Sequence, residues 1–425
     1  MEINKDFDLL KKVSAYFDEN TLRKIVAEEK SIDKSDIEIL SWNFEKISGK
    51  GDNYLSVVDR LFIKSRAQQK TLETRIIVKS MPENVFRRKL LRSAEYFRNE
   101  IIFYTEISRR FSKYLKSKGQ AQLLSIPLCF AYHLDGDNDF IALQDVTDLG
   151  FSPISRHACL NYEECKYIIE AIAQFHAISF AYKNEHREEF ERIASLLNET
   201  FYREDIFETS FKCFNDDLFR IARDALAKEY PGSKGEKVFN SYEPDKLYKK
   251  VVDICAKKDA ETSVISQGDT WAPNFMMRRT KHGKTEILIL DFQIARCASP
   301  VLDVVFFIYQ CTDKKLRDRY YDTLLKEYYD ILTKTMKLLG TDADVHYSWE
   351  TFQKEVKEQS LYGLMFALMN VPLSLIPENA VFDLDSIKEE VSDIADLDTL
   401  PNLEKAEDRQ RLADIILHAV EKEFI

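Results

Sequence analysis

The first 145 residues carry the pattern of strands interrupted by one helix. Runs rich in β-branched and aromatic residues predict five strands, over residues 37–47, 54–64, 71–79, 126–134 and 139–145. Apolar side chains recur every three or four positions from residue 87 to residue 115, which is typical of an amphipathic helix. Polar segments with glycine join the first two strands and the last two, which favours hairpins. These elements predict a compact first lobe.

Beyond residue 160 the pattern becomes mainly helical. Helices are predicted over residues 161–184, 203–229, 244–257, 301–338, 348–370 and 404–423. A group of short apolar runs separated by polar turns interrupts them, and it predicts strands over residues 263–267, 274–278 and 285–291. We therefore expect a mainly helical second lobe with a small β island, whose loops are displayed on a rigid base.

Composition and charge narrow the class of protein. The chain has 425 residues, of which 45% are hydrophobic and 31% charged, so it can bury a sizeable core. The formal net charge of −11 disfavours binding to nucleic acid or to an anionic membrane. No long apolar run predicts a membrane span or a signal peptide, so we expect a cytoplasmic protein. The seven scattered cysteines indicate neither a disulfide framework nor a zinc site, and no obligate protein partner is evident.

Two carboxylates and an amide stand at the ends of the island strands. Four residues separate Asp269 from Asn274, and Asp291 follows four apolar strand residues and precedes Phe292. Protein kinases place a base and a metal-binding Asn at this D-x-x-x-x-N spacing, and a second metal-binding Asp in D-F-G. Each residue taken singly is more simply a turn or cap residue. Together, three hard oxygen ligands in this order suit Mg²⁺, and they predict phosphoryl transfer.

The first lobe supplies features that a nucleotide site needs. Gly49 and Gly51 would let backbone amides approach a triphosphate, although a plain hairpin explains them nearly as well. Lys79 ends a strand as the lysine of V-A-I-K does, and Glu100 on the next helix can hold its ammonium in place. A lone lysine at a strand end is usually solvated, so this pairing is the testable point. Backbone groups of the segment that links the lobes are candidates for contacting adenine, around Gln144 and Val146.

The ordered set of motifs resembles the ecdysteroid kinase-like (CHK kinase-like) family of insects. The resemblance spans roughly residues 30 to 370 and rests on Gly51-Asp52-Asn53-Tyr54, Asn99-Glu100-Ile101-Ile102-Phe103-Tyr104, Ala142-Leu143-Gln144-Asp145-Val146, Gln174-Phe175-His176-Ala177, Gly268-Asp269-Thr270-Trp271, Asp291-Phe292-Gln293 and Ser299-Pro300-Val301-Leu302-Asp303. This family belongs with the aminoglycoside phosphotransferases and choline kinases. The resemblance implies their two-lobed protein-kinase-like fold and the ATP- and Mg²⁺-dependent phosphorylation of hydroxyls on small molecules.

The resemblance also implies roles for individual residues. Asp269 would be the catalytic base, and Mg²⁺ would be bound by Asn274 and Asp291. ATP would be contacted by Gly49, Gly51, Asn53, Lys79, Glu100, Gln144 and Val146. Asp303 is expected to brace the catalytic loop, and His176 to be a hydrogen-bonded core residue. Trp271 either lines the acceptor pocket or packs beneath the loop.

Three positions depart from the family pattern. The family usually has His before Gly-Asp, where this chain has Gln267. Because that His hydrogen-bonds within the loop, an amide can replace it, although reduced or lost activity is an alternative. Gln144 stands where Glu is common, and Pro273 stands where Asn is frequent. Neither change removes a backbone contact to adenine or the spacing from Asp269 to Asn274.

The sequence thus predicts an α+β, bilobal protein-kinase-like fold. Its N-terminal nucleotide-binding lobe, residues 1–145, would hold a five-stranded antiparallel sheet and one helix, and residues 146–425 would form the catalytic and acceptor-binding lobe. The predicted function is an ATP-dependent small-molecule O-kinase with a sterol-like (ecdysteroid) or xenobiotic hydroxyl acceptor. A pocket for this acceptor is expected between the β island and the C-terminal helices. The alternatives are a catalytically silent ligand-binding protein, suggested by Gln267, and a choline or aminoglycoside kinase.

Overall fold

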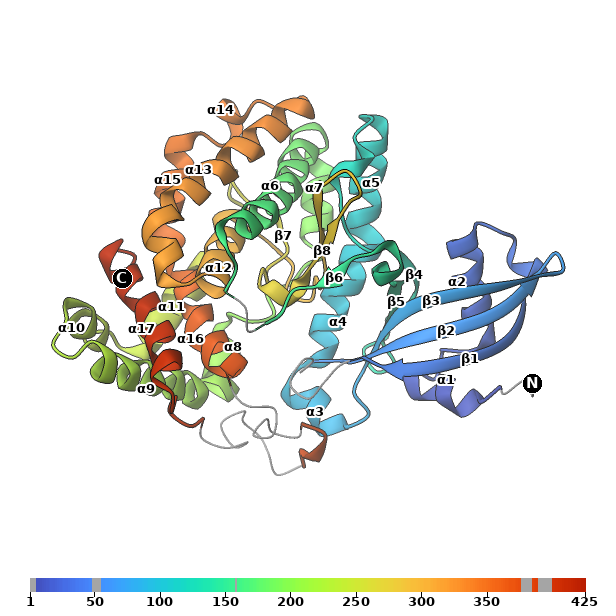
Figure 1. The fold of residues 1–425 in the computed structure, drawn as a ribbon, viewed down its shortest axis with the longest axis horizontal. Coiled ribbons are helices and arrows are strands. Elements are labelled where there is room, and N and C mark those ends of the chain that lie inside the picture. Colours follow the sequence, from blue (N-terminus) through green and yellow to red (C-terminus); the bar gives the residue numbers. More distant parts are fainter. Residues whose placement is uncertain (1–4, 48–54, 157–158, 376–383, 389–399) are drawn as a thin grey trace. The chain divides into compact units, whose positions relative to one another are not determined.

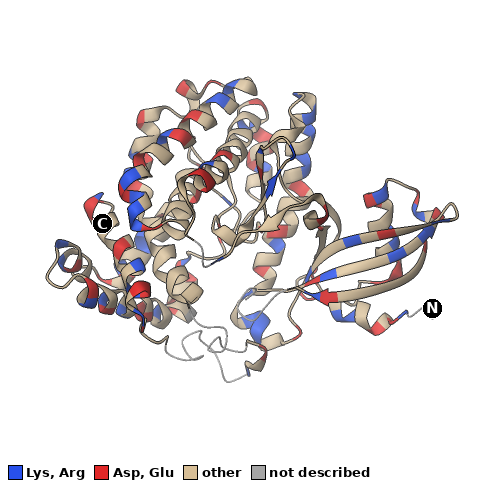
Figure 2. Ribbon diagram, viewed as in Figure 1, with Lys and Arg blue, Asp and Glu red and all other residues tan. Residues whose placement is uncertain are grey.

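The protein forms two compact units in the computed structural model (Figure 1), which describes residues 5–47, 55–156, 159–375, 384–388 and 400–425. Unit 1 contains residues 1–105, 127–150 and 377–391, and unit 2 contains residues 106–126, 151–376 and 392–425. Charged residues of both signs are interspersed along the elements of each unit (Figure 2). In the part of the chain that the structure describes, no helix has the length and apolar character needed to cross a membrane.

Unit 1 is built on a five-stranded antiparallel sheet. Its strands, in the order β1-β2-β3-β5-β4, are β1 (Glu38–Lys46), β2 (Val57–Ala67), β3 (Lys70–Ser80), β4 (Cys129–His133) and β5 (Phe140–Gln144). The strands β2 and β3 extend beyond their predicted ends and meet in a tight turn at Gln68 and Gln69, both of which have positive φ. This hairpin lacks the glycine or asparagine that normally marks such a turn, so the sequence pattern placed the strand ends too early.

Two short helices cover one face of this sheet (Figure 1). Helices α1 (Phe7–Val13) and α2 (Glu19–Lys30) begin at the capping carboxylates Asp6 and Asp18. They pack a continuous apolar core against alternate positions of the strands, including Leu10, Leu22, Ile25, Val26, Leu61, Ile63, Ile76 and Val78. The alternation places Leu61 and Ile63 on one face of β2 and their neighbours on the other face.

The predicted single helix over residues 87–115 is wrong in its continuity. The structure has α3 (Val85–Leu90), α4 (Ser93–Ile102), a π-helical turn over Phe103–Ile107 and α5 (Ser108–Ser117). The break falls at Arg92, which has a φ of 52° in the left-handed region. The apolar spacing continues through this residue, so periodicity alone did not reveal the break.

Unit 2 is mainly helical. Its longer helices are α6 (Tyr162–Glu185), α9 (Lys212–Glu229), α11 (Pro244–Cys255), α12 (Val301–Cys311), α13 (Lys314–Leu338), α15 (Trp349–Gln359), α16 (Leu361–Leu375) and α17 (Ala406–Glu421). Shorter helices are α7 (Arg187–Ala194), α8 (Glu204–Ile206), α10 (Lys234–Asn240) and α14 (Ala343–His346). The predicted helix over residues 301–338 is two helices, because Asp313 caps a new start at α13. Helix α6 packs along α13, and α12 packs along α16.

The β island consists of two small sheets. In one, β8 (Phe275–Arg279) pairs with β9 (Thr285–Ile289) and with the short strand β6 (Ser152–Pro153). In the other, β7 (Val264–Ser266) pairs with β10 (Arg296–Ala298). The three predicted island strands are present, and β6 and β10 were not predicted. The five-stranded antiparallel sheet of unit 1 and the mainly helical unit 2 confirm the predicted α+β fold. The single helix expected beside the sheet is wrong in number, because α1 and α2 also belong to unit 1.

Candidate active site

The loop from β7 to β8 is held from below by one buried carboxylate. Asp303, in the first turn of α12, accepts hydrogen bonds from the backbone amides of Gln267 (2.8 Å) and Gly268 (2.9 Å). Its backbone carbonyl accepts the hydroxyl of Thr270 (2.6 Å). His176 of α6 bonds to the same carboxylate through Nε2 (3.1 Å). The expected brace is therefore confirmed, and His176 is the expected hydrogen-bonded core residue, since it is fully buried.

Gln267 joins the two functional loops through its side-chain amide. Its Nε2 donates to the backbone carbonyls of Leu290 (2.9 Å) and Asp291 (2.6 Å), and its Oε1 accepts from the backbone amide of Asp269 (2.7 Å). The side chain is 1% exposed, so these bonds are not in competition with solvent. An amide at this position thus makes the loop contacts that were expected of it.

Asp269 and Asn274 meet across the loop. The Nδ2 of Asn274 donates to the carboxylate of Asp269 (2.8 Å) and to its backbone carbonyl (2.9 Å). Burial raises the pKa of Asp269 to about 7, the negative charge of Asp291 adds to the rise, and the hydrogen bond from Asn274 opposes it. A carboxyl group with this pKa can exchange a proton near neutral pH, which is what a general base requires.

Asp291 follows β9 in a constrained conformation. Its φ is 56°, in the left-handed region that residues other than glycine rarely adopt. Its backbone carbonyl is held by Gln267 at 2.6 Å, and its Oδ1 accepts the amide of Gln293 at 3.4 Å. Strained backbone of this kind is concentrated at functional sites, because the surrounding contacts offset its cost.

The residues around Asp269 and Asp291 fit a divalent cation. Burial is the main cause of the raised pKa of Asp269, and repulsion by the Asp291 carboxylate adds to it. A cation bound by this group would relieve the repulsion. Because the amide nitrogen of Asn274 faces Asp269, its oxygen is the atom left for a cation. No cluster of three or more His, Cys, Asp or Glu side chains suited to a metal occurs in the described part of the chain. The cation would therefore depend on phosphate oxygens and water for its other ligands, as Mg²⁺ commonly does.

Residues that the sequence analysis missed support this loop from behind. Gly268 has a φ of 88°, and a Cβ at this position would lie 2.1 Å from the carbonyl oxygen of Ile294. Tyr362 of α16 donates its hydroxyl to the Gly268 carbonyl (3.1 Å). The buried Arg296 stacks over the Tyr362 ring and pairs with Glu199 at 3.1 Å. Only the arginine inside an apolar strand pattern could have signalled this support, since its partners are far away in the sequence.

Trp271 lies in the same loop with a partly exposed side chain. Its backbone amide donates to the carbonyl of Asp269 (2.8 Å), and its carbonyl accepts the amide of Asn274 (3.0 Å). These bonds keep the turn between Asp269 and Asn274 tight.

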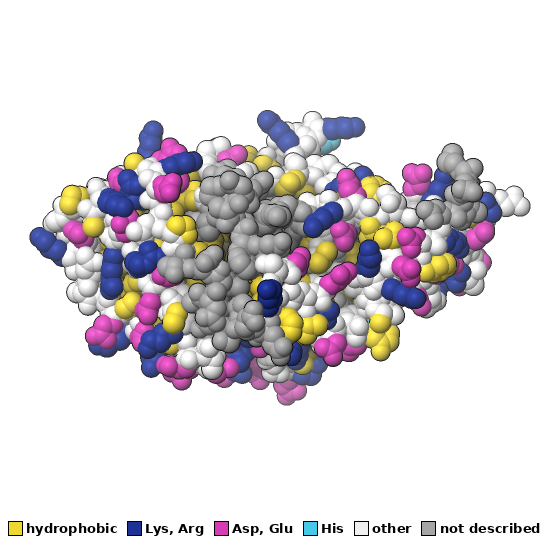
Figure 3. All heavy atoms as spheres, turned by 90° about the horizontal axis from the view of Figure 1, so that it is seen from below, with side chains coloured by type: hydrophobic (Ala, Val, Ile, Leu, Met, Phe, Trp, Pro, Cys, Tyr) yellow, Lys and Arg dark blue, Asp and Glu magenta, His cyan; other side chains and the backbone are white. Residues whose placement is uncertain are grey.

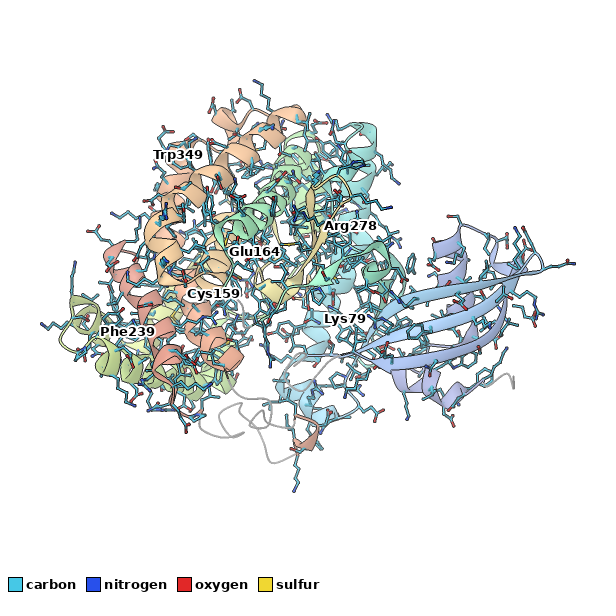
Figure 4. The ribbon with its side chains drawn as sticks, in the orientation of Figure 1. Lys79, Cys159, Glu164, Phe239, Arg278 and Trp349 are labelled. Atoms are coloured by element: carbon cyan, nitrogen blue, oxygen red, sulfur yellow. The ribbon has the colours of Figure 1, made fainter. Side chains whose placement is uncertain are left out.

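Unit 1 brings Lys79 and Glu100 together. The Lys79 Nζ lies 2.8 Å from the Glu100 Oε1, and the two residues are 9% and 0% exposed. Lys79, which is labelled in Figure 4, is near the end of β3. Glu100 is on α4, so strand and helix each supply one partner. The pairing expected from the sequence is present. A buried ammonium held in this way is positioned to meet an anion such as a phosphate.

The segment after β5 is anchored by a second ionic group. Asp145 is 3% exposed, accepts a hydrogen bond from Arg60 Nε (2.7 Å) and forms a salt bridge with Arg75, whose Nε lies 2.9 Å away. Burial alone would raise the pKa of Asp145, but hydrogen bonds from Thr147 and Arg60 hold it below its usual value. The sequence analysis assigned no role to this group. Its signal is the presence of one arginine on β2 and one on β3. Because Arg75 pairs with Phe62, two residues beyond Arg60, the two arginine side chains share one face.

Gln144 and Val146 flank this carboxylate. The backbone amide of Gln144 donates to the backbone carbonyl of Leu128 (2.8 Å), and the backbone carbonyl of Val146 accepts from the backbone amide of Gly150. These bonds restrict the backbone contacts that the two residues can offer to a nucleotide. The remaining predicted nucleotide contacts, Gly49, Gly51 and Asn53, lie outside the described residues.

The comparisons with known proteins identify the family. The model of the ecdysteroid kinase-like family matches residues 50–341. Among curated proteins, no sequence matches this chain. The structure of Plasmodium vivax ethanolamine kinase is 14% identical, with 90% of this chain and 92% of that chain covered and a TM-score of 0.40. The GDP and kanamycin complex of APH(2")-IIia is 11% identical, with 95% and 98% covered and a TM-score of 0.38.

Both TM-scores are below 0.5, so the assignment rests on the family model alone. The matched residues begin at residue 50, include β2 to β9 and the loop around Asp269, and end at residue 341, just after α13. The match covers more than half of the chain, and the chain therefore belongs to the ecdysteroid kinase-like family.

Proposed function

We propose that the protein is a small-molecule kinase that transfers the γ-phosphate of ATP to a hydroxyl group. The observation that carries the proposal is the loop of unit 2, where Asp269 and Asn274 are hydrogen-bonded and the charge of Asp291 acts on Asp269. This set has the residue types, order and spacing that phosphoryl transfer requires. In unit 1, the buried ammonium of Lys79, held by Glu100, supplies the positive side chain that binds a triphosphate.

In the proposed reaction, Asp269 orients the acceptor hydroxyl and accepts its proton. The acceptor oxygen forms a bond to the γ-phosphorus as the bond to the β–γ bridging oxygen breaks, which releases ADP. Lys79 binds the α- and β-phosphates, and Glu100 holds the ammonium of Lys79 in position. Asn274 and Asp291 hold Mg²⁺, which when bound neutralises charge on the phosphate oxygens. Asp303 and Gln267 keep these groups aligned through the loop backbone.

For the acceptor we propose a hydroxyl of a sterol-like (ecdysteroid) or xenobiotic compound, which membership of the family supports. A catalytically silent binding protein is the second candidate, because Gln267 replaces the histidine common at that position. The three hydrogen bonds of the Gln267 side chain argue against this second reading. They hold Asp269 and Asp291 in one arrangement without a histidine.

The test is phosphate transfer from γ-labelled ATP to a panel of hydroxylated steroids and plant compounds, with Mg²⁺ present. We expect the wild-type protein to label at least one acceptor. Asp269→Asn should lower the transfer rate by about 10²–10⁴-fold, the usual contribution of a general base, while ATP binding is kept. Asp259→Asn, at an exposed aspartate of the same unit, is the matched control and should keep wild-type activity.

Two results separate the candidates. Full activity of Asp269→Asn on a verified acceptor would contradict the role of this residue. A kinase should also show a rise in melting temperature with millimolar Mg²⁺ and ATP, because a ligand that binds the native state stabilises it. Absence of both the temperature rise and any labelled product would favour the silent binding protein.

A further inference from the structure

Unit 1 contains a cavity of about 760 Å³ that no proposed step uses. Ligand sites for small molecules commonly have about 300–1,000 Å³, so this cavity is of the right size. It lies among α1, the adjoining ends of β1, β2 and β3, the start of α3 and the segment 384–388. Its wall is largely apolar and includes Leu9, Val13, Phe44, Val57, Met81, Val85, Phe86 and Ile387.

The cavity is on the opposite face of the sheet from Lys79. Lys79 pairs directly with Val58 across β2 and β3, so these two side chains share one face. Asp59 and Ser80 are the next residues along their strands, and both line the cavity. Because side chains alternate along a strand, Asp59 and Ser80 point away from the face of Lys79. A ligand in this cavity is therefore separate from a nucleotide held by Lys79.

A returning part of the chain forms one wall. Asn84 donates from Nδ2 to the backbone carbonyls of Asp385 and Ile387, both at 2.9 Å. Arg87, which is 5% exposed, pairs with the Asp385 carboxylate at 2.7 Å. Ile387 is consequently buried at 3% exposure. These specific contacts show that the wall is built into unit 1.

The mouth of the cavity leaves apolar side chains in solvent. Val85 is 51% exposed and Phe86 is 37% exposed, although both are large hydrophobic residues. Figure 3 views this side of the molecule, and hydrophobic side chains are visible at the surface in the region of α3. Solvent-exposed apolar groups at the rim of an apolar cavity are typical of a ligand site.

Asp59 is the only charged wall residue that is partly buried among the described ones. It forms no hydrogen bond or ion pair with the described residues, and burial raises its pKa while Lys46 on β1 opposes the rise. The other charged wall residues are exposed, and they include both signs: Lys12, Glu83, Asp385 and Lys388. Asp385 already pairs with Arg87. Lys46 is the cross-strand neighbour of Asp59 on β1, but the two side chains form no ion pair. The inner wall therefore presents one partly buried carboxylate that no described residue pairs with directly.

We propose that this cavity binds a small molecule with an apolar body and a single protonated amine, whose ammonium pairs with Asp59. The apolar wall would take up the body of the ligand, and the charge of Asp59 selects an amine over a carboxylate of the same shape. The proposal does not depend on kinase activity, because binding alone is measured.

The probes are dehydroabietylamine and dehydroabietic acid, which share one tricyclic body and differ in the head group. Isothermal titration calorimetry at pH 7 with the full-length protein should show binding of the amine, with the acid at least about tenfold weaker. Saturating ATP and Mg²⁺ should leave the affinity for the amine unchanged, as should Lys79→Met. Equal affinity for the two probes, no binding of the amine, or competition by ATP would overturn the proposal.

Two variants locate the site. Asp59→Asn should weaken binding of the amine at least about tenfold and remove the preference over the acid. Val85→Trp should weaken both probes by filling the mouth, and it adds bulk only at an exposed position. Glu73→Gln, at an exposed acid on the far part of β3, is the control and should bind as the wild type does. Wild-type affinity in both Asp59→Asn and Val85→Trp would contradict this location.

Discussion

Replacing Asp303 with Asn tests whether one buried carboxylate holds the loop that carries Asp269. The Oδ1 of Asp303 accepts the Gly268 amide, and its Oδ2 accepts the Gln267 amide and bonds to His176. The residue is 1% exposed, so water cannot replace a lost partner. Asparagine has the same shape but only one acceptor oxygen. Either orientation of its amide therefore turns an NH₂ group toward a backbone N–H.

The size of the effect follows from these contacts. At least one hydrogen bond to a charged group is lost, which is worth about 1.5–3 kcal/mol. The donor left without an acceptor adds about 1–3 kcal/mol. We therefore expect Asp303→Asn to lower the free energy of unfolding by about 3–5 kcal/mol, the range seen when one partner of a buried charged pair is removed.

The assay combines urea unfolding with hydrogen exchange of the peptide that covers β7 and the loop to Asn274. The variant should unfold at a lower urea concentration, and the amides of Gln267 and Gly268 should exchange faster. Asp313→Asn is the matched control, because Asn caps a helix as well as Asp does, and it should be close to wild type. A loss below about 1 kcal/mol in Asp303→Asn with unchanged exchange would refute the reasoning.

Three further predictions concern the loop around Asp269 and the ion pairs of Asp145. Gly268→Ala should lower the melting temperature sharply. An alanine in the left-handed conformation costs about 1–2 kcal/mol, and its Cβ would lie 2.1 Å from the carbonyl oxygen of Ile294. An unchanged melting temperature would contradict this contact. Asp269 has a folded-state pKa of about 7, above its unfolded value, so its contribution to stability falls as pH rises from about 4 to 7. In metal-free buffer Asp269→Asn should therefore unfold at a higher temperature than wild type at pH 8, with little difference at pH 4. Arg60→Met and Arg75→Met should each lower the free energy of unfolding less than the double variant, which leaves Asp145 without its two cations. The loss in the double variant should differ from the sum of the two single losses, because both arginines pair with one carboxylate. Additive losses would argue against this shared pairing.

Much of the fold was predictable because it depends on local pattern. The alternation of apolar residues located all five strands of unit 1, and the spacing of three and four located the long helices. Breaks at single residues were not predictable. Arg92 adopts a left-handed conformation inside a helical pattern, and Gln68 and Gln69 form a turn without glycine. At these positions the tertiary contacts decide the conformation, and the local propensity does not show it.

The candidate site was predictable where residues stand close together in sequence or at fixed spacing. Asp269 and Asn274 are close in sequence, five positions apart, and their side chains form the hydrogen bond that this spacing allows. Sequence spacing could not predict the hydrogen bond from Tyr362 to Gly268 or the ion pair of Arg296 with Glu199. These partners are brought together only by the packing of helices and strands. Asp59 is a similar case, since its place in the wall of an apolar cavity depends on α1 and on segment 384–388.

The central claim is that Lys79 in unit 1 and Asp291 in unit 2 act on one bound nucleotide. The most direct test is calorimetric measurement of ATP affinity, with Mg²⁺ present, for wild type, Lys79→Met and Asp291→Asn. Both variants should bind ATP at least about tenfold more weakly, since each loses a charge-assisted contact to the nucleotide or its cation. Wild-type affinity in either variant would show that the two residues do not serve the same ligand.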